Sequence, residues 1–300
     1  MAQFLPFQRQ NIALVGVGDL GTQILLALIA TKQANVIVLT RTAASKTLPP
    51  DLSSVPIIEA DYADVSALTA LLKSQNIEIV VSTLSSTPGL KAQYPLADAA
   101  KASGTVKLFV PSEWGLPNEG AKQRGEHNLF GFKDTFAEHL RTIGLPYARF
   151  YTGFFTEHLK WLVGLETNDF VNVLGKGETP FSVTSEEDIG GFVAHVLTSL
   201  PSDSPHLNNR CLRMEGERVT MRDLARIYNK PLLFVPQSNE IPAKTAEEAE
   251  FKTLLQIEAD GGRASTGWDR LTATERGDAG AANKLWEGHV WKTVENTKTK

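Results

Sequence analysis

The feature that most constrains the fold is a glycine-rich turn between an apolar run and an amphipathic segment. The run Ile12–Val15 stops at Gly16, and apolar residues recur at helical spacing after Gly21. This order predicts a strand, a tight turn and a helix. In such turns the glycines permit unusual backbone angles, close approach of a pyrophosphate, and close packing of helix on strand. We therefore predict that a dinucleotide binds at Gly16, Val17, Gly18, Asp19, Leu20 and Gly21. The alternative is a purely structural turn.

Apolar runs then alternate with helical segments as far as Val110, with runs near residues 36–39, 56–60, 79–82 and 107–110. Five strands joined by crossover helices predict a doubly wound parallel sheet, an α/β fold of the Rossmann-like kind. The texture of the sequence changes after residue 150. We expect a dinucleotide-binding domain over residues 1–150 and a smaller C-terminal α+β substrate region over residues 151–300, with some segments of the latter returning to the sheet domain.

The C-terminal half offers weaker signals. The runs 170–174 and 181–183 flank a Gly175–Gly177 turn and predict a short hairpin. Asp188 lies among acidic residues at a predicted helix start, which is a simpler role for it than catalysis. A helix is expected over residues 221–228. The polar tail after Gly261 has no role that we can assign from its sequence.

Composition narrows the class of partner. The net charge is only −4 and the chain has no basic block, so electrostatic capture of nucleic acid has no obvious source and a small molecule is the expected partner. One cysteine and the absence of a leader-like segment favour a reducing, cytoplasmic setting. The front apolar stretch is too short to span a membrane. The oligomeric state stays open, and a homodimer is compatible with the sequence.

Residues at the ends of the second and fourth strands bear on cofactor choice. A basic residue after the second strand suits a 2′-phosphate, so Arg41, helped by Lys46, favours NADPH. The alternative for Arg41 is a solvated surface arginine. The hydroxyl residues Ser82, Thr83 and Ser85 follow the fourth strand, where they either line the cofactor or form a turn.

The residue types argue for redox chemistry on a bound nicotinamide. The six histidines show no metal-ligand spacing, and no nucleophile elbow is present. No tyrosine has a lysine four residues later, which is the usual acid pair of short-chain reductases. Lys133 is the best replacement, because we expect it in the first turn of a helix over residues 132–143, where the dipole and partial burial lower its pKa. A solvated lysine is the alternative.

Several spaced motifs together resemble the NmrA-like, isoflavone-reductase-like family of atypical short-chain dehydrogenases/reductases. The resemblance covers roughly residues 10–235. Its motifs are Gly16–Gly21, Arg41, Phe109–Gly115, Lys133, Leu145–Tyr147 and Glu187–Ile189.

The resemblance implies an NADP-dependent oxidoreductase that binds NADPH along the glycine turn and Arg41. It also implies that Lys133 is catalytic in reducing an aromatic or phenolic metabolite. The same family contains proteins that sense the nicotinamide pool and regulate a partner without turnover. That role is the alternative function.

Overall fold

The computed structural model describes residues 9–42, 48–85, 87–236 and 238–298. The chain divides into two compact units, each built from three segments. The first unit comprises Met1–Glu113, Phe132–Arg149 and Ile189–Leu212, and the second comprises Trp114–Gly131, Phe150–Asp188 and Arg213–Lys300.

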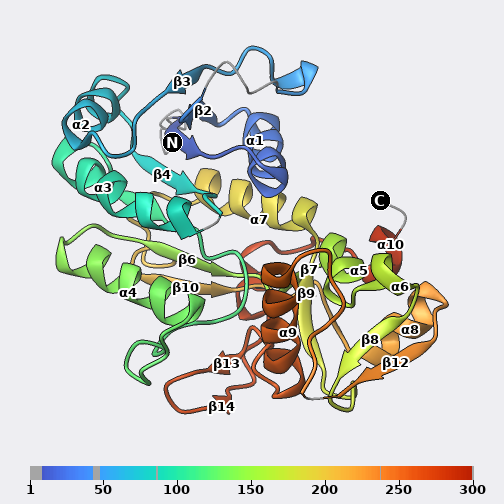
Figure 1. Ribbon diagram of the computed structural model, residues 1–300. Coiled ribbons are helices and arrows are strands. Elements are labelled where there is room, and N and C mark those ends of the chain that lie inside the picture. The colour runs from blue at the N-terminus through green and yellow to red at the C-terminus, as the bar shows by residue number, and fades with distance from the viewer. Residues whose placement is uncertain (1–8, 43–47, 86, 237, 299–300) are drawn as a thin grey trace. The chain divides into compact units, whose positions relative to one another are not determined.

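The first unit contains a five-stranded sheet in the order β3-β2-β1-β4-β5, with every neighbouring pair parallel. Strands β2, β3 and β4 of this sheet are labelled in Figure 1. The middle strands are buried over their apolar runs, as expected for a sheet covered on both faces. The predicted doubly wound α/β fold is therefore confirmed. The strands are β1 (Gln10–Val15), β2 (Ala34–Thr40), β3 (Ile57–Glu59), β4 (Ile79–Ser82) and β5 (Leu108–Val110).

Helices join these strands, and one of them starts earlier than the sequence pattern indicated. Helix α4 begins at Leu129 instead of Phe132, because the Asn128 side chain accepts hydrogen bonds from the N–H groups of Phe130 (2.9 Å) and Gly131 (3.3 Å). Gly144, at φ +65°, follows its end. The helices are α1 (Asp19–Thr31), α2 (Val65–Ser74), α3 (Thr87–Ser103), α4 (Leu129–Thr142) and α7 (Glu186–Ser199), with a short 3-10 turn η2 (Pro50–Leu52). The first residues of α4 and α7, 129–131 and 186–188, belong to the second unit.

The second unit is built from short strands whose partners are distant in the chain. Its sheets are β11-β9-β7 and β12-β8, while β13 pairs with β14. Its strands are β7 (Phe154–Phe155), β8 (Val171–Leu174), β9 (Phe181–Thr184), β11 (Glu217–Val219), β12 (Leu232–Val235), β13 (Trp268–Asp269) and β14 (Thr274–Glu275). Strands β6 (Ala148–Tyr151) and β10 (Arg210–Arg213) pair with each other, and each has residues in both units.

The predicted hairpin of residues 170–174 and 181–183 is wrong. Strand β8 pairs in parallel with β12, and β9 pairs with β11 and β7. The Leu174 N–H at the end of β8 donates to the Gln256 side chain (2.9 Å), so a side chain takes the group that would start a hairpin ladder. The apolar runs correctly marked two strands but did not specify their partners.

Helical segments complete the second unit. The predicted helix of residues 221–228 is confirmed as α8, which opens with a capping box between Thr220 and Asp223. The helical elements are η3 (Thr156–His158), α5 (Leu159–Leu162), α6 (Leu165–Asn168), α8 (Met221–Tyr228), α9 (Ala246–Asp260), η4 (Ala281–Leu285) and α10 (Val294–Thr297).

Candidate functional site

The carboxyl ends of three neighbouring strands gather most of the candidate residues. Because β4 lies between β1 and β5 and all three are parallel, the segments that follow them leave the same edge of the sheet. This is the edge at which doubly wound sheets bind ligands. The glycine turn follows β1, Ser82 ends β4, and the segment leading to Glu113 follows β5.

The glycine turn has the geometry that its spacing predicted. Gly16 has φ +95°, which disfavours a side chain. A Cβ on Gly21 would lie 2.5 Å from the Gly16 carbonyl oxygen, whereas one on Gly18 would meet nothing within 4 Å. Helix α1 starts at Asp19 after Gly18, which has no side chain to cap the first-turn N–H groups. The turn is therefore closely packed at Gly21 and open at Gly18, and open space beside the main chain is what the approach of a phosphate requires.

Thr83 supports this turn from the neighbouring strand end. Its hydroxyl donates to the Gly16 carbonyl oxygen (2.9 Å), and the same Oγ1 would lie 2.8 Å from a Cβ on Gly21. Ser82 is buried and lies opposite Val15 in the β1–β4 register, while Ser85 is exposed. The three hydroxyls thus occupy different environments, and the Thr83 hydroxyl supports the glycine turn.

Arg41 follows β2 directly and is exposed, as a residue that meets a ligand from solvent has to be. Its charge acts on Tyr62. Burial raises the pKa of Tyr62 to about 12, and the nearby Arg41 guanidinium partly opposes that rise. Lys46, the second basic residue expected at this place, lies outside the described residues.

Lys133 lies in the second turn of α4, one turn later than expected. Its ammonium donates a hydrogen bond to the backbone carbonyl oxygen of Glu113, and the residue is half-buried. Glu113 comes three residues after Val110, the last residue of β5. The helix and the strand end therefore hold the amine between them.

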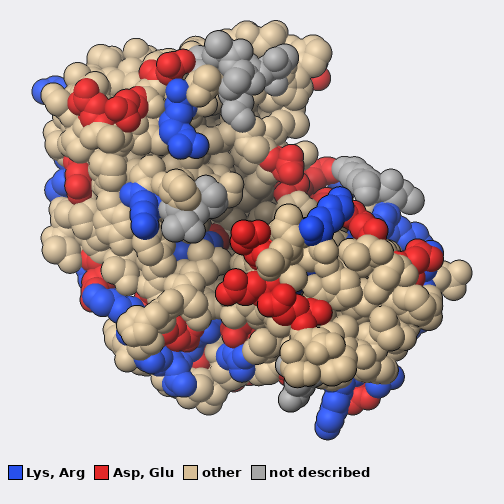
Figure 2. Space-filling view, viewed as in Figure 1, with Lys and Arg blue, Asp and Glu red and all other residues tan. Residues whose placement is uncertain are grey.

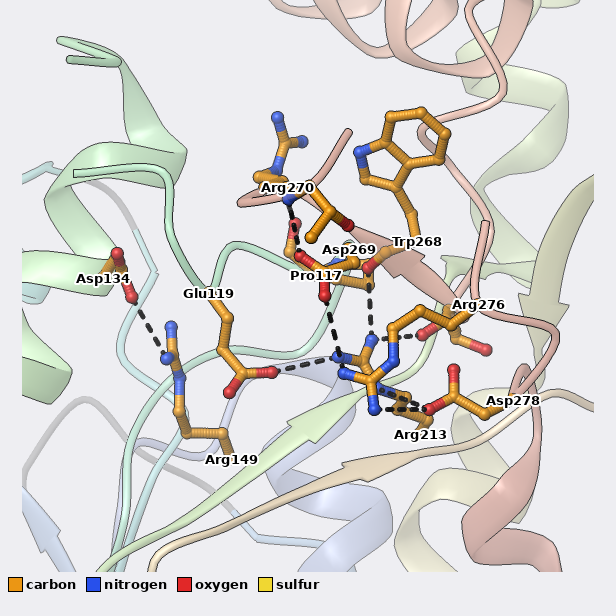
Figure 3. Close-up of polar contacts among 12 residues, drawn as sticks. Pro117, Glu119, Asp134, Arg149, Arg213, Trp268, Asp269, Arg270, Arg276 and Asp278 are labelled. Carbon is orange, nitrogen blue, oxygen red and sulfur yellow. Dashed lines mark hydrogen bonds and ion pairs between the residues drawn. The ribbon is translucent and has the colours of Figure 1, made fainter. Parts of the chain in front are cut away.

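A buried arginine holds two carboxylates beside Lys133. Arg149 Nε lies 2.8 Å from Glu113 Oε1, and both side chains are only 2% exposed. Arg149 Nη1 lies 3.2 Å from Asp134 Oδ1, the contact drawn at the left of Figure 3. Sequence reasoning missed this cluster, because Glu113, Asp134 and Arg149 come from three separate segments.

Burial is the main cause that lowers the pKa of Lys133. The Glu113 carboxylate opposes this by raising the pKa, and the Arg149 guanidinium lowers it further. The direction agrees with the expectation from the sequence. Burial is one of the two causes expected, whereas the other, the helix dipole, acts mainly in the first turn, and Lys133 lies in the second.

Two buried arginines of the second unit join the connection after β5 to the C-terminal tail (Figure 3). Arg270 donates to the Pro117 carbonyl oxygen (2.6 Å) and pairs with Glu126 (3.1 Å) and Glu258 (2.5 Å). Arg213 pairs with Glu119 (3.0 Å) and donates to the Thr266 carbonyl oxygen (2.6 Å). The tail, to which sequence patterns assign no role, thus fastens that long connection.

Asp188 is a residue of the first turn of α7, as expected, and it also anchors the tail. Its buried carboxylate lies 2.9 Å from His289 Nε2 and accepts a hydrogen bond from the Lys292 N–H (2.7 Å). The His289 ring stacks on Trp286, with 3.6 Å between ring centroids. This arrangement ties the tail tryptophans to the start of a helix.

The face drawn in Figure 2 has no basic patch, because acidic and basic side chains are interspersed on it. No helix in the described segments has the length and apolar character needed to cross a membrane. Within the same segments, no group of three or more His, Cys, Asp or Glu residues is placed to hold a metal ion.

Comparisons with known proteins give the family. Oxidoreductase BOA1 of Botryotinia fuckeliana is 29% identical over 72% of this chain and 73% of its own length. Phenylcoumaran benzylic ether reductase PT1 of Pinus taeda is 27% identical over 60% of this chain and 58% of its own. The solved structure of AtPrR2 with NADP+ and (+)-pinoresinol has a TM-score of 0.71 at 19% identity, covering 98% of this chain and 99% of that one. The model of the NmrA-like family matches residues 8–296, so the resemblance is confirmed and the chain belongs to the NmrA-like family.

Proposed function

We propose that this protein is an NADPH-dependent reductase of a small aromatic or phenolic metabolite, with Lys133 as its general acid. Family membership supports the proposal, as do relatives that are named as an oxidoreductase and as a benzylic ether reductase. The observation that carries it is a half-buried lysine with a lowered pKa at the ligand-binding edge of the sheet. In this proposal residues 1–150 bind the cofactor and residues 151–300 form the substrate-binding region.

The residues after β1 and β2 fit a phosphorylated dinucleotide. The open space at Gly18 and the close contact between Gly21 and the Gly16 carbonyl suit a pyrophosphate bound against the main chain. Arg41 would pair with the 2′-phosphate, with Lys46 as the second cation, and Ser82 and Ser85 would lie along the same edge. NADPH bound there would supply the hydride.

Lys133 would handle the proton. Its amine is fixed by the Glu113 carbonyl, and its lowered pKa brings the group nearer to neutral pH, where proton transfer is effective. Strand β5 lies two strands from β1, roughly 10 Å across the sheet. An extended dinucleotide on the glycine turn covers such a separation.

An aromatic pair supports the proposed substrate class. Trp114 stacks on Phe150, with 5.5 Å between ring centroids and 23° between the planes. Trp114 directly follows Glu113, and it has φ +35°, an unusual conformation for a bulky residue. Phe150 is fully buried and Trp114 is partly exposed, so we infer that Trp114, backed by Phe150, offers a flat face to an aromatic substrate.

The test is consumption of NADPH with a panel of phenolic and aromatic substrates, in the wild type and in Lys133→Ala. We expect the variant to lose about 10²- to 10⁴-fold in kcat and to keep its affinity for NADPH. Lys107→Ala is the control, because Lys107 is an exposed lysine paired with Glu78 that precedes β5. Full turnover in Lys133→Ala would overturn the role of Lys133. NADPH binding that alters association with another protein, without consumption on any substrate, would favour the sensing alternative.

A further inference from the structure

Arg149 is a costly residue to keep where it lies. It is among the largest fully buried side chains of the protein, on strand β6. Burying a guanidinium is unfavourable unless anions and hydrogen-bond acceptors surround it. Arg149 has two such anions, Glu113 at 2.8 Å and Asp134 at 3.2 Å, and they come from the two segments that hold Lys133.

Glu113 acts with both its backbone and its side chain. Its carbonyl oxygen accepts the hydrogen bond from the Lys133 ammonium, while its carboxylate pairs with Arg149. Asp134, the neighbour of Lys133 in α4, pairs with the same guanidinium. The contacts therefore close a ring from Lys133 through Glu113 and Arg149 to Asp134 and back along the helix. A displacement of one member moves the carbonyl or the helix turn that orients the amine.

The backbone next to this ring needs such support. Trp114 follows Glu113 in the left-handed region at φ +35°, where a bulky side chain is strained. Strained conformations persist where surrounding contacts hold the adjacent groups in place. The buried pairing of the Glu113 carboxylate provides a fixed point one residue away.

We propose that Arg149 is a positioning residue for Lys133: it holds Glu113 and Asp134 so that the Glu113 carbonyl keeps the amine in one orientation. Arg149 does not itself touch the substrate or cofactor in this account. The inference rests on the proposed function, because it assumes that the orientation of Lys133 matters for turnover.

The ring also makes an electrostatic signature that a packing role lacks. Glu113 raises the pKa of Lys133, and Arg149 lowers it. Removing the Glu113 charge therefore moves the titration of Lys133 to lower pH. Removing Arg149 moves it to higher pH, because a like charge is lost and the Glu113 carboxylate is left without its main cation.

The experiment measures the pH dependence of Lys133 labelling by an amine-reactive reagent, read by peptide mass spectrometry, together with kcat and KM for NADPH. The variants are Glu113→Gln, Arg149→Met and the two combined. Glu113→Gln keeps the side-chain shape and an oxygen acceptor, so it tests the charge even where Arg149→Met does not fold. Asp98→Asn is the matched control, since it removes a carboxylate that pairs with His139 of α4 (2.8 Å).

We expect the labelling midpoint to fall in Glu113→Gln, to rise in Arg149→Met and to stay unchanged in Asp98→Asn. In the double variant the labelling midpoint should lie between those of the two single variants. Its kcat should stay on the order of 10-fold to 100-fold below the wild type, because the pairing of Glu113 with Arg149 is absent. Shifts in the same direction, or a double variant with wild-type kcat, would overturn the proposal. Labelling shifts as expected, together with wild-type turnover in Lys133→Ala, would instead refute the proposed function.

Discussion

The two units of this chain are stabilised in different ways. The first is organised around parallel strands that follow one another through crossover helices, and its core is a continuous apolar cluster. The second has its own apolar cluster, but its long connection and tail are held by buried charged side chains such as Arg213 and Arg270. Repeating local patterns therefore specify the first unit, whereas pairings between distant residues specify much of the second.

The largest expected effect is a loss of stability when a buried charged side chain of the second unit is removed. Arg270→Met removes the cation that faces Glu126 and Glu258 and the donor to the Pro117 carbonyl. Because two carboxylates are left without it, we expect the free energy of unfolding to fall by about 3–5 kcal/mol. Urea denaturation followed by circular dichroism measures the change.

Arg276→Met is the control for that variant. Arg276 is 49% exposed and lies 3.4 Å from Asp278, so its loss should cost less than about 1 kcal/mol. Equal losses in the two variants would show that the buried contacts of Arg270 do not hold the tail and that the proposed difference between the units is wrong.

The next effect appears at high pH and compares one tyrosine in each unit. Burial raises the pKa of both Tyr62 and Tyr228 to about 12, from 10.0 in the unfolded chain. Their stabilising contribution is complete below pH 10 and is lost as the pH rises toward 12, because the unfolded chain releases the protons first. For Tyr62, which is 3% exposed, the loss is about 2–3 kcal/mol.

Denaturant unfolding at pH 8, 10 and 12 tests this in Tyr62→Phe and Tyr228→Phe. Each variant should lose less stability than the wild type between pH 10 and pH 12. The Tyr62 hydroxyl donates to the Leu39 carbonyl (2.9 Å), so its variant starts about 1 kcal/mol lower at pH 8. Identical pH profiles in all three proteins would contradict the burial of these hydroxyls.

The smallest expected effect concerns the hydrogen bond that supports the glycine turn of the first unit. Thr83→Val removes the hydrogen bond to the Gly16 carbonyl with little change in shape, which should cost about 1 kcal/mol of stability. We also expect weaker NADPH binding, because the glycine turn loses its support. Thr69→Val, whose hydroxyl bonds within α2 (2.7 Å to Val65), should leave NADPH affinity unchanged in the same fluorescence titration. Equal affinity in Thr83→Val would separate Thr83 from the cofactor site.

The difference between the units also explains what could be read from the sequence. The alternation of five strands with crossover helices and the glycine turn both follow from local periodicity, so the sequence predicts them, whereas the order β3-β2-β1-β4-β5 comes from the structure. The hairpin across Gly175–Gly177 was predicted wrongly, because short apolar runs do not encode that β8 pairs with β12. Helix α4 starts before its expected position because Asn128 caps it, and the apolar periodicity used to place the helix does not mark a capping residue.

The candidate site shows the same division. Lys133 was selected from its place after the fifth strand, and its lowered pKa followed from the expectation of burial. Its partners could not be found in this way, because Glu113 and Arg149 are 36 residues apart and neither segment carries a local pattern that indicates their pairing. The charged residue in the run Pro146–Phe150 was the one available signal, because a charge in a buried strand requires a partner.

The most direct test of the account is a fluorescence titration of the wild type and Arg41→Ala with NADPH and NADH. We propose that a diphosphate lies on the glycine turn and the 2′-phosphate beside Arg41. We therefore expect tighter binding of NADPH than of NADH in the wild type, and loss of that preference in the variant with little change for NADH. Equal affinity for the two dinucleotides in the wild type, or no binding of either, would contradict this proposal.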